Sequence, residues 1–522
     1  MAVNKLVKKE KDWFKLKRYP HIDYPLLAKD RHVWIEPYVT NPLKVAAHNF
    51  YPLIHKKSKV RKFRREYCEK TGKLIFTYKE GKKIVRNAAK PKERELYYAG
   101  HLDALVYSYY AELLTKEYEK ILSNKNLTDV VTAYRKIPVT VGSKKHKCNI
   151  DFAVDVFKSI NEYPKDNFVA IAFDIKGFFD NLNHKLLREQ WKKVLGLTTE
   201  PLPDDHFNVF RNITRFSYID LVDIFQEFQN QIFVKASANG KPTISRKRVS
   251  KIKYLKKSDA IAFCTKDEYL AKIKSLVKKQ RFVKDEAENT VTKDFGIPQG
   301  SPISAVLANI YMLDFDYEIN RYIESIGGIY RRYSDDMVAI CPLDKKDDVI
   351  KEFANKIQNS CLTIQDKKTQ IFHFERQVRK LKCGQEFPNG INYNKNFIYL
   401  GLEFDGAEAK IKSASISGYY RKMKRTIKRG KYFSKKPQNK YAGELFKSRL
   451  LKKFSYKGAD RRNKYIWNIS KSYFEITQHF DWGNFISYAK KAQKIKFPNK
   501  VKTQTKKHWN KLEKLLKITR WV

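Results

Sequence analysis

The chain has 522 residues and a formal net charge of +51 at pH 7, from 107 Lys and Arg against 56 Asp and Glu. This excess of positive charge is larger than solubility requires and favours a polyanionic partner such as nucleic acid. Hydrophobic residues make up 42% of the chain, enough for about three domains or subdomains. No apolar stretch approaches the roughly 20 residues that cross a bilayer. We therefore expect a soluble, cytoplasmic protein without membrane contact.

The cysteines form no pattern that points to a metal module or a disulfide framework. They show no CxxC pair and no matching His cluster. We expect small buried side chains at Cys68, Cys148, Cys264, Cys341, Cys361 and Cys383.

The amino-terminal part, residues 1–165, mixes short strands, loops and one helical pattern. Residues 76–86 indicate a hairpin that turns at Glu80 and Gly81, and a basic stretch follows at 90–94. Apolar residues recur at helical spacing from 101 to 122, which predicts a packed helix.

A fully buried strand is predicted at residues 168–173, because all six positions are apolar. The strand ends at Asp174, directly before a helical pattern over 176–195. The next segment, about 198–292, shows amphipathic helical spacing and a Lys/Arg-rich stretch near 245–257. That spacing indicates folded structure, but the segment carries no recognisable chemistry.

Residues 295–304 place two Gly and two Pro in a short loop ahead of an apolar helix at 305–312. A glycine-lined loop that opens a helix lets the backbone approach a nucleotide closely, and Gln299 can then hold a base or sugar edge. A purely structural loop is the alternative interpretation.

Two strand-like runs meet at residues 333–336, which read Tyr-Ser-Asp-Asp. This places two carboxylates at a hairpin tip, although a solvated turn explains the same pattern. Asp174 adds a third carboxylate at the carboxyl end of a core strand. Three such carboxylates suit two divalent ions about 4 Å apart, the arrangement used for nucleotidyl transfer. Mg²⁺ fits because it takes oxygen ligands, with Mn²⁺ as an alternative.

The composition changes beyond Phe404. Residues 407–522 contain 33 Lys and Arg against 6 Asp and Glu. Helical patterns dominate this basic region, and it includes Trp467, Trp482, Trp509 and Trp521.

Five motifs, taken in this order, resemble those of the reverse transcriptases. They lie at residues 173–181, 295–311, 333–336, 362–369 and 399–404. The resemblance covers about residues 75–405 and implies an α+β right-hand polymerase fold. Its parts are the fingers, a ferredoxin-like palm with an antiparallel sheet, a helical thumb and a basic helical carboxyl-terminal region. We expect an N-terminal region and fingers (1–165), a palm (166–405) with a fingers or insert segment (about 198–292), and a thumb with a carboxyl-terminal domain (406–522).

The resemblance also assigns catalytic roles. Asp174, Asp335 and Asp336 would hold two Mg²⁺ ions, with Asp336 the least directly bound. Lys368 would be the general acid for pyrophosphate, a role that suits a positioned ammonium group.

Further residues of the matching motifs are assigned to the nucleotide. Phe179 would be the steric gate that favours dNTPs over rNTPs, and Gln299 and Gly300 would line the incoming nucleotide. Arg94 resembles the fingers arginine that clamps the triphosphate, and Arg135 is a second candidate.

The resemblance implies an RNA-directed DNA polymerase that uses dNTPs and an RNA template to make cDNA. The residues of these motifs resemble those of prokaryotic enzymes. Three further segments, 92–122, 133–135 and 149–153, are most similar to the defence-associated abortive-infection and "unknown group" reverse transcriptases. Such an enzyme would act in antiphage defence with a dedicated noncoding RNA. The insert at 198–292 would cover the template channel or support a homo-oligomer.

Three alternatives remain at this point. The same site could support protein-primed or weakly templated DNA synthesis, or the enzyme could be of the group II intron or retron type. Paired cysteines typical of many group II maturases are missing, and retron enzymes are usually shorter. The third alternative is a non-catalytic RNA-binding scaffold, which three clustered acids disfavour because they repel one another without metal. The acids after residue 405 are too sparse for an RNase H site.

Overall fold

The computed structural model describes most of the chain. The chain divides into two compact units, and each unit is made of three separate segments of the sequence. The first unit holds residues 1–134, 175–318 and 354–363, and the second holds 135–174, 319–353 and 364–522. The described residues are 12–63, 66–68, 73–75, 77–81, 83–86, 88–143, 145–238, 241–280, 282–284, 290–378, 380–438, 442–460, 463–468, 473–480 and 483–517. Within them, no helix combines the length and the apolar composition needed to span a bilayer.

The second unit is built on an antiparallel sheet of six strands in the order β16-β17-β8-β18-β19-β20. Their bounds are Ile329–Tyr333 (β16), Asp336–Pro342 (β17), Asn167–Asp174 (β8), Gln370–Gln377 (β18), Lys380–Phe387 (β19) and Gly390–Asn392 (β20). The predicted strand at 168–173 and the hairpin around 333–336 are therefore both confirmed.

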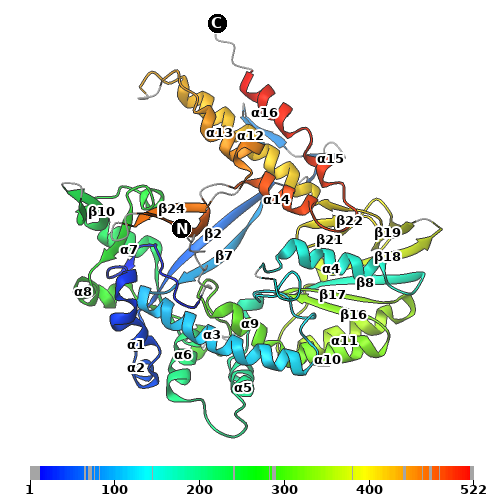
Figure 1. Ribbon diagram of the computed structural model, residues 1–522, viewed down its shortest axis with the longest axis horizontal. Coiled ribbons are helices and arrows are strands. Elements are labelled where there is room, and N and C mark those ends of the chain that lie inside the picture. The colour runs from blue at the N-terminus through cyan, green and yellow to red at the C-terminus, as the bar shows by residue number, and fades with distance from the viewer. Residues whose placement is uncertain are drawn as a thin grey trace, which may run out of the picture. The chain divides into compact units, whose positions relative to one another are not determined.

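The strand β8 is apolar on both faces because both faces of the sheet are covered. Phe168 and Ala170 pack with Phe157 of helix α4 (Asn149–Asn161) in one core. On the opposite face the Phe173 ring stacks on Phe353 of α11 (Lys346–Asn359), with ring centroids 4.2 Å apart. Figure 1 shows α4 and α11 on opposite sides of the sheet. This double burial explains the unbroken hydrophobic run of the sequence.

A smaller sheet and five helices complete the second unit. The sheet has the strand order β21-β22-β23, with bounds Phe397–Tyr399, Leu402–Phe404 and Ala409–Ile411. The helices are Ser413–Ser434 (α12), Lys447–Phe454 (α13), Phe485–Gln493 (α14), Val501–Thr505 (α15) and His508–Lys517 (α16). Helices dominate the carboxyl-terminal region, as predicted, but Asn463–Asn468 (β24) and Tyr473–Phe480 (β25) add an antiparallel hairpin that was not predicted. The side chains of Trp467, Trp482 and Trp521 lie outside the described residues.

The first unit contains two four-stranded sheets and three hairpins. One sheet has the order β1-β12-β10-β11, with bounds His21–Ile22, Ala260–Cys264, Ile232–Ala238 and Lys241–Lys247. The other has the order β13-β9-β2-β7, with bounds Lys278–Lys279, Ser217–Asp220, Leu53–Phe63 and Ala88–Tyr98. The hairpins are Glu66–Cys68 with Lys73–Ile75 (β3, β4), Thr77–Glu80 with Lys83–Arg86 (β5, β6) and Phe282–Lys284 with Thr290–Thr292 (β14, β15).

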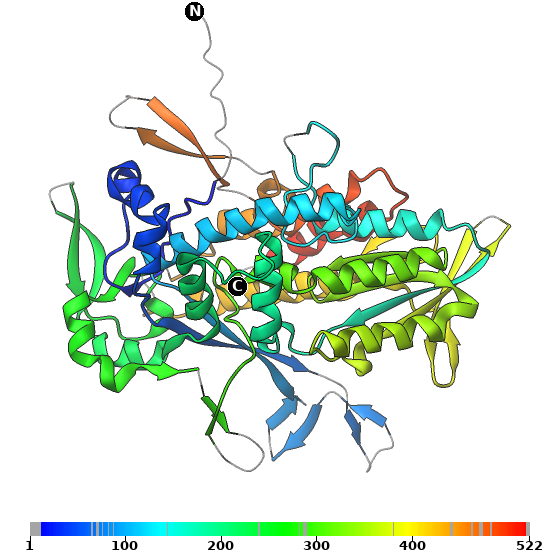
Figure 2. The same ribbon diagram turned by 90° about the horizontal axis from the view of Figure 1, so that it is seen from below.

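The strands β2 and β7 form a long ribbon, and Figure 2 shows the two blue hairpins β3–β4 and β5–β6 continuing from its far end. The hairpin predicted to turn at Glu80 and Gly81 is confirmed as β5–β6. The helices of this unit are Glu36–Val39 (α1), Pro42–Ala46 (α2), His101–Asn124 (α3), His184–Val194 (α5), Asp204–Thr214 (α6), Leu221–Phe228 (α7), Lys266–Leu276 (α8) and Ser304–Tyr311 (α9). The chain passes from one unit to the other within α10 (Leu313–Ser325) and within α11.

Three sequence predictions differ from the structure in the first unit. Cys361, expected to be buried, is exposed. The helix predicted from residue 176 begins only at His184, because Gly177 has a left-handed backbone (φ +55°) and Asn183 caps α5 by accepting from the Leu186 N–H at 3.0 Å. The segment 198–292 also contains strands β9 to β15 besides its helices.

A buried histidine pair makes the first unit sensitive to acid. His21 is fully buried, and its ring centroid lies 6.3 Å from that of His101. Burial lowers the pKa of His21 from 6.5 to about 3 and that of His101 to about 4. Because the unfolded chain binds protons first as the pH falls, the stabilisation is present above pH 6.5 and is lost below it.

We expect the wild-type free energy of unfolding to fall by about 2 kcal/mol per buried His between pH 7.5 and pH 5. His21→Leu should remove the share of that decline that comes from His21, about 2 kcal/mol, measured by thermal unfolding across this pH range. The exposed His146 provides a control, since His146→Gln should keep the wild-type slope. An unchanged slope in His21→Leu would contradict this explanation.

Candidate active site

The hairpin between β16 and β17 turns through Ser334 and Asp335. Tyr333 and Asp336 are paired across the turn, and Ser334 has a left-handed backbone (φ +62°). The guanidinium of Arg332 is fully buried and donates to the Ser334 carbonyl at 3.2 Å. A turn held in this way fixes the direction of the two carboxylates that follow.

Asp174 lies directly opposite Asp336 in the ladder between β8 and β17. Residues opposed in an antiparallel pair have Cβ atoms about 5 Å apart, so the two carboxylates share one face of the sheet. The Asp174 carbonyl accepts from the Gln365 N–H at 2.8 Å. The motif at 362–369 is therefore tied to the end of β8, beside the carboxylates.

The electrostatics of the hairpin tip are unfavourable for a third ionised carboxylate. Although Asp336 reaches solvent, the protein packed around its carboxyl group raises its pKa to about 6, with further contributions from the charges of Asp335 and Asp174. The ammonium groups of Lys368 and Lys412 act in the opposite direction but do not cancel the effect. At neutral pH the site therefore carries negative charge that the fold does not neutralise.

Lys368 forms an ion pair with Asp174, Nζ to Oδ1, at the edge of this cluster. Among the described residues, no group of three or more His, Cys, Asp and Glu side chains is arranged to hold a metal ion. The donor chemistry nevertheless fits a divalent cation, since carboxylate oxygens are the ligands that a hard cation prefers. The metal-binding roles of Asp174, Asp335 and Asp336 stay a prediction.

The loop around Gln299 belongs to the first unit and is fixed against β7. The Gln299 carbonyl accepts from the Tyr97 N–H at 2.9 Å. Gly300 has φ +121°, and a Cβ atom there would lie 2.5 Å from the Tyr97 carbonyl oxygen. Only glycine fits this position, because the Gly300 backbone lies directly against that of Tyr97.

Phe179 lies beside the same loop. Its carbonyl accepts from the Ile297 N–H at 2.8 Å, and its half-buried side chain sits next to Phe178. Arg94 is exposed on β7, opposite Ser58 of β2. The structure thus brings Phe179, Gln299 and Gly300 together in the first unit. Arg135 is the first residue of the second unit, where Asp174, Asp335, Asp336 and Lys368 also lie.

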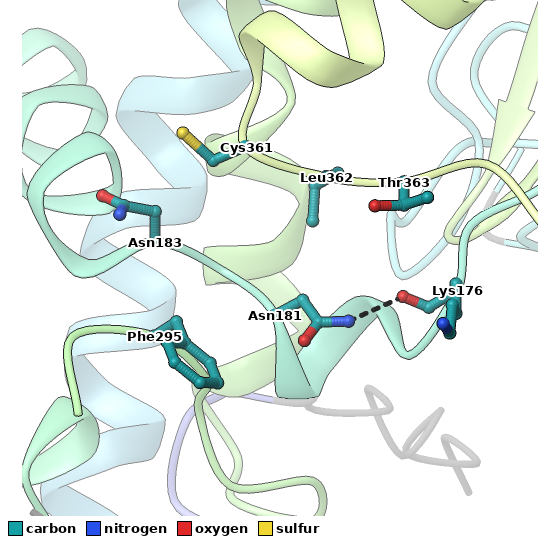
Figure 3. Close-up of a pocket in the computed structure, with 7 residues that line it drawn as sticks. All are labelled: Lys176, Asn181, Asn183, Phe295, Cys361, Leu362 and Thr363. Atoms are coloured by element: carbon teal, nitrogen blue, oxygen red, sulfur yellow. Dashed lines mark hydrogen bonds between the residues drawn. The ribbon is translucent and has the colours of Figure 1, made fainter. Parts of the chain in front are cut away.

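A pocket of about 410 Å³ opens beside the segment that follows Asp174 (Figure 3). Its lining combines an ammonium group, two amides, a hydroxyl, a thiol and an aromatic ring, with no carboxylate: Lys176, Asn181, Asn183, Phe295, Cys361, Leu362 and Thr363. Asn181 Nδ2 donates to the Lys176 carbonyl at 2.9 Å. The sequence gave no sign of this pocket, because its residues come from three separate segments.

Three further residues near the carboxylates were not singled out by the sequence. Arg332 supports the turn, Lys412 acts on Asp336, and Tyr399 carries a buried hydroxyl without a hydrogen-bond partner. An Arg inside a strand normally points to solvent, so nothing local identified Arg332. Of these three residues, only Tyr399 lies in a motif that the sequence analysis named, the motif at 399–404.

Comparison with known proteins identifies the class of this site. Residues 250–404 match the family model described as reverse transcriptase (RNA-dependent DNA polymerase). This match includes Gln299, Asp335, Asp336 and Lys368, whereas Asp174 precedes it. The similarity to this family is therefore shown for residues 250–404, a segment that includes strands β16 to β19 of the antiparallel sheet.

Among curated proteins, the chain is similar to the Retron Ec86 reverse transcriptase of Escherichia coli, with 38% identity over 93 residues. That match covers 17% of this chain and 29% of the retron enzyme, so the similarity extends over less than a third of the length of that relative.

Among solved structures, apo telomerase from Candida tropicalis truncated from its C-terminal domain aligns at 11% identity and a TM-score of 0.33, over 73% of this chain and 60% of that one. Telomerase from Candida albicans in complex with the TWJ fragment of telomeric RNA aligns at 12% identity and a TM-score of 0.33, over 79% and 57%. These TM-scores are too low to establish a shared fold.

Removing one carboxylate should stabilise the metal-free protein. In EDTA at pH 8 the ionised Asp336 is repelled by its neighbours, so we expect Asp336→Asn to raise the free energy of unfolding by about 1 kcal/mol after allowance for solvent screening. The melting temperature should rise by about 2 °C. Added Mg²⁺ or Mn²⁺ should stabilise the wild type more than the variant.

The exposed Asp347 supplies the matched control. Asp347→Asn should change neither the melting temperature in EDTA nor the response to metal. Equal metal stabilisation of the wild type and Asp336→Asn would remove Asp336 from the metal site.

Proposed function

We propose that this chain is an RNA-directed DNA polymerase that extends a primer with dNTPs on an RNA template. The observation that carries the proposal is the placement of Asp174 opposite Asp336, with Asp335 beside it at a hairpin tip. The match of residues 250–404 to the reverse transcriptase family supports the same chemistry.

In this proposal Asp174, Asp335 and Asp336 hold two Mg²⁺ ions, with Mn²⁺ as an alternative. Divalent ions at such a site lower the pKa of the primer 3′-hydroxyl and stabilise the departing pyrophosphate. The ladder between β8 and β17 keeps two of the three carboxylates at a fixed separation. The buried Arg332 holds the turn in place, so the carboxylates need little rearrangement before reaction.

Lys368 is proposed to carry the proton that the leaving pyrophosphate takes up. Its Nζ pairs with Asp174, so its ammonium group already lies at the carboxylate cluster. A charged donor in that place can pass a proton to a phosphate oxygen as the negative charge develops.

The nucleotide contacts are proposed from the resemblance of the motifs. Phe179 would exclude the ribose 2′-hydroxyl, and Gln299 with Gly300 would line the nucleotide. Arg94 or Arg135 would contact the triphosphate. The exposed position of Arg94 on the β2–β7 ribbon is compatible with this contact.

We further propose that the enzyme works in the cytoplasm of a prokaryote, in antiphage defence, on a dedicated noncoding RNA. The similarity of residues 92–122, 133–135 and 149–153 to the defence-associated reverse transcriptases supports this assignment. Sequencing the RNA that copurifies with the protein, together with the DNA product, would test it. Recovery of unselected cellular RNA alone would contradict a dedicated template.

The polymerase proposal predicts that Asp335→Asn combined with Asp336→Asn lowers primer extension by at least about 1000-fold, because the charge that holds the metal ions is lost. The measurement is incorporation of labelled dNTP on a primed RNA template with Mg²⁺. Asp347→Asn is the control and should keep wild-type activity. Undiminished incorporation by the double variant would refute the proposal.

The steric gate predicts a change in sugar selectivity at Phe179. Phe179→Ala should raise the efficiency of rNTP relative to dNTP incorporation by about tenfold or more, because the ring no longer excludes the 2′-hydroxyl. Single-nucleotide incorporation with each triphosphate measures the ratio. Phe178→Leu changes the neighbouring buried ring and should leave the ratio unaltered. The same ratio in Phe179→Ala and wild type would rule out the gate.

A further inference from the structure

The insert between the motifs at 173–181 and 295–311 contains a strongly basic segment that the catalytic proposal does not use. Within residues 243–258 there are seven Lys and Arg and no Asp or Glu. All seven are exposed, and we call them the insert basic surface: Arg246, Lys247, Arg248, Lys251, Lys253, Lys256 and Lys257.

The backbone of this segment is anchored to the core of the first unit. Val249 and Leu255 are buried in the core of the first unit, and the Val249 N–H donates to the Gln229 carbonyl at 2.8 Å. The preceding residues belong to β11, which pairs with β10 along its whole length. This part of the fold can be located by the β10 label in Figure 1. The backbone that carries the basic side chains is therefore held in place by the fold of the first unit.

The positive charge of this surface is largely uncompensated. Arg246 pairs with Glu268 at 2.7 Å, but none of the other six basic residues forms an ion pair within the described part of the chain. On the β2–β7 ribbon, by contrast, Lys57 and Lys59 both reach Glu93. Six like charges left unpaired on one rigid segment favour the binding of a polyanion.

An aromatic ring accompanies the charges. Tyr254 is 39% exposed, and the Lys253 Nζ lies 5.0 Å from its ring centroid. Proteins that bind RNA combine ammonium groups for the phosphates with exposed rings on which unpaired bases stack. A lipid surface would instead be expected to meet several exposed apolar side chains, and Ile244 is the one large exposed aliphatic residue in this segment.

We propose that the insert basic surface binds the phosphate backbone of a folded RNA, with Tyr254 contacting an unpaired base. This inference rests on the proposed function, because an RNA-directed polymerase has an RNA to hold. The insert basic surface would be a second RNA-binding site of the enzyme. It would bind the phosphate backbone of the RNA and take no part in nucleotide addition.

The test uses the full-length protein and a hairpin RNA with a stem of about 16 base pairs and a single-stranded loop. We expect Lys251→Gln, Lys253→Gln and Lys256→Gln together to weaken binding about tenfold and to lower the slope of log Kd against log salt by about 2. Tyr254→Ala should weaken binding about fivefold with an unchanged slope.

The matched control removes the same charge elsewhere in the first unit, from three exposed lysines: Lys29, Lys44 and Lys185. Their triple exchange to Gln should leave RNA affinity within about twofold of wild type. Equal losses in both triple variants would overturn the proposal, because binding would then follow net charge alone. An equal loss for a DNA hairpin of the same sequence would overturn the assignment to RNA.

Primer extension on poly(rA) with oligo(dT) separates this inference from the proposed function. The insert variant should extend that unstructured template at the wild-type rate, and its melting temperature should match that of the control variant. If the wild type fails to extend the primer, the proposed function fails, whatever the binding data show. If extension is normal and the insert variant binds the RNA hairpin as tightly as wild type, this inference alone fails.

Discussion

The ladder between β8 and β17 is the constraint on which the second unit depends. It buries an apolar strand between two helical layers, and by doing so it sets Asp174 against Asp336. Hydrophobic burial thus stabilises an arrangement that electrostatics opposes, since the protein packed around Asp336, together with the charges of Asp335 and Asp174, raises the pKa of its carboxyl group. The ladder between β8 and β17 thus fixes the positions of Asp174 and Asp336 relative to each other.

Much of this arrangement could be predicted from the sequence, because its signals are local. The apolar run 168–173 predicted a buried strand, and the Tyr-Ser-Asp-Asp turn predicted a hairpin; both are present. The two glycines of the Gln299 loop were also informative, since Gly300 leaves no room for a side chain. The resemblance to the reverse transcriptase motifs then accounted for the order of the strand, the Gln299 loop and the hairpin along the chain.

The features that were missed depend on contacts between distant segments. Arg332 lies in a strand whose alternation gives no hint that its guanidinium is buried beneath the turn. Strands β10 to β12 were hidden in a segment whose spacing suggested helices, because β1, some 210 residues earlier in sequence, completes their sheet. The hairpin β24–β25 was also missed, because helical patterns dominate the sequence around it.

The contact between Gly300 and β7 has a mechanical consequence. The Gln299 carbonyl is hydrogen-bonded to Tyr97, and the Gly300 backbone rests on the same residue. The loop therefore cannot shift without β7, and β7 is paired with β2 along the whole ribbon. If the proposed function holds, a nucleic acid that bends the ribbon would displace the Gln299 loop in the same motion, and the proposed nucleotide contacts would change with it.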